Sequence, residues 1–173
     1  MSGLNVLVWV VEGTWQGCVD AVLANVPAGA EVTLLHVTGT EVAEVAGGAS
    51  AGLLGRGRRG RDPGALIEAA ARVAAEDLLD AAEARLGRPA ARVSAEGRVE
   101  RVVVEVAAER AADLLVLARD GDRARLGPRS LGPATRFVVD HAPCAVLLAW
   151  PDGAPGVGSI PPPPPPGHQP PPR

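Results

Sequence analysis

The residues with the clearest chemical potential lie in the segment 118–135, where glycines and hydroxyl side chains follow an apolar run. That run, 114–118, ends in an Arg-Asp-Gly turn, and Gly132 precedes a second periodic segment. A loop that leads from a strand into a helix presents free backbone N–H groups and the positive end of the helix dipole, which together bind anions. The sequence therefore predicts an anion site here, with candidate residues Ala118, Arg119, Gly121, Ser130, Gly132 and Thr135.

A second set of candidates follows two earlier apolar runs, 6–11 and 32–37. In a parallel sheet with a reversal of strand order, the ligand crevice lies at the carboxyl ends of the strands that flank the reversal. The first and fourth expected strands supply those ends here. The remaining candidate nucleotide-binding residues at this edge are Val11, Glu12, Gly13, Thr14 and Val37.

The elements that must position these residues can be read from hydrophobic periodicity. Five short apolar runs predict strands, at 6–11, 32–37, 91–95, 114–118 and 145–149. Helical spacing or helix-start residues predict helices that begin near Trp15 and at Asp62-Pro63, and others over 98–110 and 132–141. Alternating strands and helices indicate a single α/β domain over 1–150, with a five-stranded parallel sheet and helices on both faces.

The segment 98–110 is ambiguous, because Arg-Val-Val-Val-Glu-Val has the β-branched composition of a strand. We interpret it as a helix, since its valines share one face and a parallel sheet needs a crossover at this point. The glycine-rich segment 38–61 has no sustained pattern, and its basic part, 55–61, favours a mobile loop over a nucleic-acid contact because no aromatic residues are interleaved. Residues 151–173, with six consecutive prolines, predict a polyproline-like or disordered tail.

Composition and charge exclude several functional classes. The net charge of the 173 residues is −3, and all 17 basic residues are arginines, which argues against a basic nucleic-acid binder and against lysine chemistry. No apolar run is long enough to cross a membrane, no secretion signal is recognised, and two cysteines make no disulfide framework, so a cytoplasmic protein is expected. Scattered His and Cys residues predict no metal site beyond magnesium carried by a nucleotide.

Four stretches carry a resemblance to a known family over about residues 4–150. They are Leu7–Thr14, which ends in Glu-Gly-Thr where the family has Asp-Gly-Ser, and the runs 31–37, 113–117 and 141–148. In this order and spacing they resemble the universal stress protein family. The resemblance implies an adenine nucleotide alpha hydrolase-like, Rossmann-like fold, usually in a homodimer, and stress-related roles in which some members bind ATP and others do not.

The ATP-binding members of that family carry the motif G-x2-G-x9-G-(S/T), and this sequence departs from it in three ways. Ala118 replaces the first glycine, the spacer is one residue longer, and Pro133 replaces the hydroxyl residue. Pro133 also removes a backbone N–H that a phosphate would use. By the resemblance, Glu12 stands where the family has an Asp near the adenine and ribose. Ser130, Thr135 and the loop arginines offer compensating donors.

Two functional hypotheses therefore remain open. In the first, the protein is a regulator or sensor that binds ATP or another adenine nucleotide at the carboxyl ends of the first and fourth strands. In the second, the site is not functional and the protein is a dimeric interaction module. Glu12 has no nucleophile or His partner, so no enzyme is expected, and any ATP hydrolysis would be slow and incidental.

The apolar run from Ala145 to Trp150 predicts how the protein assembles. As the last strand it would lie at the edge of the sheet, and an open apolar edge invites pairing. We expect a homodimer through this strand, together with a regulatory partner that the sequence does not identify.

Overall fold

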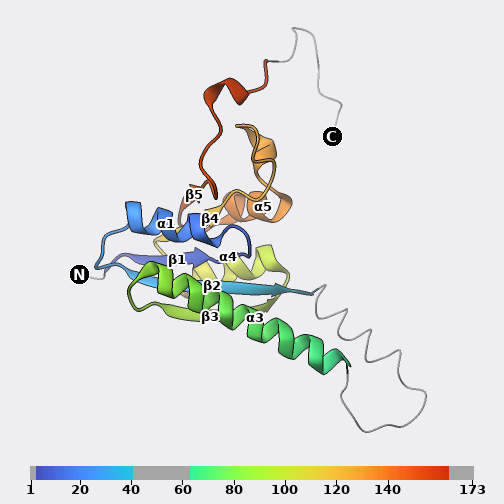
Figure 1. The fold of residues 1–173 in the computed structure, drawn as a ribbon. Coiled ribbons are helices and arrows are strands. Elements are labelled where there is room, and N and C mark those ends of the chain that lie inside the picture. The colour runs from blue at the N-terminus through green and yellow to red at the C-terminus, as the bar shows by residue number, and fades with distance from the viewer. Residues whose placement is uncertain (1–2, 41–62, 164–173) are drawn as a thin grey trace.

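The computed structural model describes residues 3–40 and 63–163, which form a five-stranded parallel sheet in the order β3-β2-β1-β4-β5 (Figure 1). The strands are β1 (Asn5–Trp9), β2 (Glu31–Gly39), β3 (Ala91–Gly97), β4 (Leu114–Ala118) and β5 (Ala145–Ala149). The helices are α1 (Trp15–Asn25), α3 (Pro63–Leu86), α4 (Val99–Glu109) and α5 (Pro133–His141), with short 3-10 turns η1 (Pro128–Ser130) and η2 (Val157–Ser159). The predicted α/β class and strand number are confirmed.

The two faces of the sheet carry separate hydrophobic cores, because side chains alternate along each strand. Val6 and Val8 of β1 point to the face that α1 and α3 cover, where they join Val22 and Leu79. Leu7 and Trp9 point to the other face, which α4 and α5 cover. The three interior strands, β2, β1 and β4, are buried on both faces, which explains their continuous apolar runs in the sequence.

The segment 98–110 forms a helix, as predicted, despite its strand-like composition. Val103, Val106 and Ala107 of α4 are buried against the sheet, and the helix makes the crossover from β3 to β4. Tertiary burial of one valine face therefore outweighs intrinsic β propensity here. The strand β2 is longer than predicted, since it continues past Val37 to Gly39.

Strand order reverses at β1, which pairs with β2 on one side and with β4 on the other. The chain moves from β1 outward to β2 and β3, and then returns to β4 and β5. The carboxyl ends of β1 and β4 are therefore neighbours, as the sequence predicted. Loops that leave these two ends diverge to opposite faces of the sheet, which is how open α/β sheets form ligand crevices.

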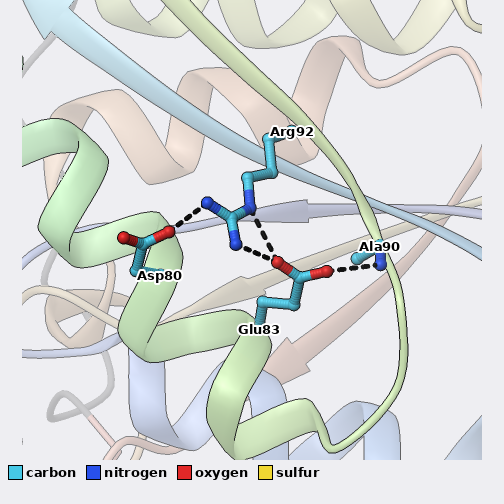
Figure 2. Close-up of polar contacts among 4 residues, drawn as sticks. All are labelled: Asp80, Glu83, Ala90 and Arg92. Atoms are coloured by element: carbon cyan, nitrogen blue, oxygen red, sulfur yellow. Dashed lines mark hydrogen bonds and ion pairs between the residues drawn. The ribbon is translucent and has the colours of Figure 1, made fainter.

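An ion-pair network joins α3 to the strand that follows it. The guanidinium of Arg92 on β3 binds the carboxylates of Asp80 and Glu83 on α3 (Figure 2). The other oxygen of Glu83 accepts a hydrogen bond from the backbone N–H of Ala90, at 3.0 Å. These contacts lower the pKa of Glu83, first through the Arg92 hydrogen bond and then through the Ala90 amide.

We predict that this network makes stability pH-dependent. Because the pKa of Glu83 is lower in the folded state, its contribution is present above the unfolded pKa, about 4.3, and is lost as the pH falls through the folded value. Glu83→Gln should therefore flatten the decline in thermal midpoint between neutral and acidic pH. Arg92→Gln should flatten it similarly, because it removes the main cause of the shift. An unchanged pH profile in both variants would contradict this assignment.

The first part of the proline-rich tail, which the sequence predicts to be polyproline-like or disordered, contacts the loop after β4. Asp152 forms an ion pair with Arg123, at 2.7 Å, and Ser159 Oγ accepts a hydrogen bond from the N–H of Leu126, at 3.0 Å. These contacts hold residues 151–160 beside the loop that follows β4, and both segments project from the domain next to α5 (Figure 1). A Pro-rich composition does not prevent local docking, because Ser159 satisfies one loop amide and Asp152 pairs with a loop arginine.

Two segments on which the sequence makes predictions lie outside the described residues. They are the basic segment 55–61 and the tail residues 164–173. Within residues 3–40 and 63–163, no helix is long and apolar enough to span a bilayer. The expected location of the protein in the cell stays a prediction.

Candidate functional site

The turn after β1 closes on itself through the carbonyl of Val11. This oxygen accepts hydrogen bonds from the N–H groups of Thr14 and Trp15, at 3.1 and 3.0 Å, and from Thr14 Oγ1, at 3.3 Å. Gly13 has a φ of +77°, a conformation that glycine adopts without strain. Thr14 occupies the N-cap position of α1, but its hydroxyl forms no capping bond and donates instead to the carbonyl of Val11.

A hollow of about 580 Å³ lies between the carboxyl ends of β1 and β2 and helix α3. Glu12 and Val37, two of the predicted site residues, line this hollow together with His36. The Nδ1 atom of His36 donates to the carbonyl of Val10 at 3.0 Å, which fixes the ring beside the hollow. The remaining wall consists of Thr38 and Gly39 of β2 and of small and apolar side chains of α3 with Asp77. The volume of the hollow is in the range of small-molecule sites.

At the end of β4, the replacement of a glycine by Ala118 causes no strain. Ala118 continues the strand, pairs in register with Ala149 of β5, and does not have a positive φ. Arg119 extends this pairing, because its N–H donates to the carbonyl of Ala149 at 2.9 Å. The first departure from the family motif therefore does not strain the backbone in this fold.

The loop after β4 is closed by backbone pairing between its two halves. The N–H of Gly121 donates to the carbonyl of Ser130 at 3.0 Å, and the N–H of Asp122 donates to that of Arg129 at 2.8 Å. A Cβ atom at Gly121 would lie 2.3 Å from the carbonyl oxygen of Arg129. The glycine is therefore needed for close approach within the loop, and its amide is already bonded to protein.

The hydroxyl of Ser130 is also engaged within the chain. Ser130 is fully buried, its Oγ donates to the carbonyl of Gly127 at 2.6 Å, and it accepts a hydrogen bond from the guanidinium of Arg119. The same guanidinium lies over the ring of Trp150, 4.7 Å from its centroid. Arg119 thus ties the ends of β4 and β5 to the closed loop instead of extending into solvent.

The amino terminus of α5 is occupied by a carboxylate of the protein itself. Oδ1 of Asp120 accepts a hydrogen bond from the N–H of Gly132 at 2.7 Å. A Cβ atom at Gly132 would lie 2.8 Å from Oδ2 of Asp120, so the carboxylate packs directly on the glycine. Pro133 is the first helical residue and has no N–H, and Thr135 is 1% exposed. The predicted anion position therefore already holds a negative charge.

The structure places the predicted residues in two separate groups. Glu12 and Val37 line the hollow beside α3, whereas none of the predicted residues from 118 to 135 does. The two groups still meet at one contact, because Arg123 of the loop donates to the carbonyl of Gly13 at 3.4 Å. Three of the five arginines between residues 119 and 136 bond within the chain: Arg119 to Ser130, Arg123 to Asp152, and Arg136 on α5 to the carbonyl of Pro128. The sequence prediction that these arginines compensate for Pro133 receives no support from these three contacts.

Asp120 was not among the predicted site residues, although the sequence contains a signal for it. It follows β4 by two residues and precedes a Gly-Pro helix start, and Asp is a frequent partner of free N–H groups at helix starts. Its distance of 12 residues from Gly132 hid the pairing. Among the described residues, no group of three or more His, Cys, Asp or Glu side chains could hold a metal ion.

The chain was compared with known protein families and with curated proteins. The model of the universal stress protein family matches residues 9–149. No curated protein matches the sequence. The matched range contains all five predicted residues of the β1 and β2 ends and all six of the loop and α5.

Solved structures show the same fold. The hypothetical protein MJ0577 is 16% identical, with a TM-score of 0.64, over 87% of this chain and 97% of that chain. Universal stress protein UspA from Lactobacillus plantarum is 20% identical, with a TM-score of 0.57, over 86% and 99%. A universal stress protein family protein from Arabidopsis thaliana, solved with AMP bound, is 16% identical, with a TM-score of 0.55, over 85% and 91%. The family match over residues 9–149, most of the chain, establishes that the chain belongs to the universal stress protein family.

Proposed function

We propose that this protein is a dimeric regulatory module that does not hold a nucleoside triphosphate at α5. The observation that carries the proposal is the internal bonding of the phosphate-facing groups. The amides of Gly121 and Gly132 and the hydroxyl of Ser130 all have partners within the chain. A phosphate would have to break these bonds, and it would gain no N–H from Pro133.

The dimeric part of the proposal is supported by the exposed edge of β5. Among the described strands, β5 pairs with β4 alone, and its other edge is free. Its side chains from Val146 to Leu148 are only partly buried, although they are apolar. Isologous pairing with a second copy would cover this edge. A monomer in sedimentation at micromolar concentration would contradict it.

A second candidate function is an adenine nucleotide regulator, as the first sequence hypothesis states. The hollow lined by Glu12 and Val37 supports it, since about 580 Å³ is sufficient for a nucleoside. The Arabidopsis thaliana relative solved with AMP bound also favours it. In this candidate, ATP or AMP, with magnesium carried by the nucleotide, would lie across the carboxyl ends of β1 and β4. Neither candidate includes a catalytic step.

One titration separates the two candidates. Calorimetry of the full chain with ATP and AMP should show no binding tighter than about 1 mM, or about 4 kcal/mol of binding free energy. A micromolar dissociation constant that weakens on Arg119→Ala would overturn the proposal and establish the second candidate. Arg101→Ala, an exposed arginine on α4, is the matched control for the loss of one positive charge.

A further inference from the structure

The loop after β4 contains two neighbouring carboxylates with different surroundings. Asp120 binds the N–H of Gly132 at the start of α5, at 2.7 Å. Asp122 binds only a local amide in the described contacts, that of Ala124, at 2.9 Å. Both side chains belong to exposed residues, so exposure does not explain why one of them reaches the helix. The difference lies in what the carboxylate of Asp120 contacts.

The position of Asp120 is that of a bound anion. The carboxylate of Asp120 packs on Gly132. A Cβ atom added to Gly132 would lie within 2.9 Å of its carbon and both its oxygens. The carboxylate lies at the positive end of the α5 dipole, which favours a negative charge. The N–H of Gly132 and the helix dipole thus suit an anion at this position, and Asp120 supplies it.

We infer that Asp120 is the residue that determines ligand charge at α5: its carboxylate takes the place of a phosphate and excludes one by occupancy and like-charge repulsion. This inference rests on the proposed function, because it gives the cause of the missing phosphate site. It assigns the largest part of that cause to the carboxylate of Asp120, in addition to the N–H that Pro133 lacks. Removal of the carboxylate should therefore create phosphate binding while Pro133 stays in place.

The test is a titration of inorganic phosphate followed by NMR of the Gly132 amide. In Asp120→Ala the amide should shift with phosphate, and binding should tighten about tenfold to hundredfold over the unmodified protein, the range expected when one hydrogen bond to a charged group is gained. Asp122→Ala is the matched control, since it removes the same charge from the same loop. It should leave phosphate binding unchanged apart from the general effect of net charge.

Asp120→Asn keeps the volume and an acceptor for Gly132, and it guards against loss of folding in the alanine variant. It should bind phosphate more weakly than Asp120→Ala but more tightly than Asp122→Ala. The inference is overturned if a folded Asp120 variant binds no better than Asp122→Ala. It is also overturned if phosphate shifts the Gly132 amide equally in the unmodified protein. The proposed function fails separately, by micromolar ATP binding to the unmodified protein.

Discussion

Replacing Leu117 by alanine is expected to lower the free energy of unfolding by about 2–5 kcal/mol, the usual cost of such a truncation in a core. Leu117 is fully buried in β4, one residue before the site loop begins to diverge from the strand. It packs in the core on the α4 and α5 face and pairs in register with Leu148. Its loss would leave a cavity under the part of the sheet that carries Ala118 and Arg119.

Equilibrium urea unfolding followed by circular dichroism measures this effect. Leu23→Ala is the matched control, because Leu23 on α1 is 53% exposed and the same truncation there opens no cavity. The control should change stability by less than about 1 kcal/mol, as surface substitutions do. Equal losses in the two variants would contradict the burial of β4 between β1 and β5.

Gly121→Ala is expected to open the loop after β4 and to cost about 1–2 kcal/mol. The added Cβ would meet the carbonyl oxygen of Arg129 at 2.3 Å and the backbone of Ser130 at 2.8 Å. Neither atom belongs to a flexible side chain, so the loop must separate and lose its two backbone hydrogen bonds, each worth about 0.5–1.5 kcal/mol. The entropy that alanine removes from the unfolded chain, about 0.4–1 kcal/mol, offsets part of this loss.

The control for this prediction is Gly29→Ala, where nothing lies within 4 Å of the added Cβ and φ is not positive. That variant should be neutral or slightly more stable, because it gains only the unfolded-state effect. Limited proteolysis gives a second readout, since an opened loop should be cut earlier at its arginines. If Gly121→Ala is as stable and as resistant as Gly29→Ala, the loop is not closed in the way described.

The sequence predicted the sheet well because the strands are buried on both faces and separated by clear helix starts. The bounds of β4 and β5 and the helix over 98–110 follow from burial of whole apolar runs and from the need for crossovers. Prediction was weaker where local polar contacts decide the structure. Thr14 has the residue type of an N-cap, yet its hydroxyl bonds back to Val11.

The candidate site could be located from sequence but not described from it. Motif spacing identifies the loop and α5, while it says nothing about whether the loop's donors are already used. The contact of Asp120 with Gly132 and that of Gly121 with Ser130 span about ten residues, and such pairings depend on the path of the loop. The docking of Asp152 on Arg123 was missed for the same reason, since composition does not report long-range ion pairs.

Hydrogen exchange of the Gly121 and Gly132 amides, measured without any ligand, tests the central claim most directly. Both amides donate within the chain, to the Ser130 carbonyl and to Asp120. The structure therefore predicts that both exchange much more slowly than unprotected amides, and that Asp120→Ala releases Gly132 while Gly121 stays protected. Rapid exchange of both amides in the unmodified protein would mean that the phosphate-facing donors are free, and it would contradict the account.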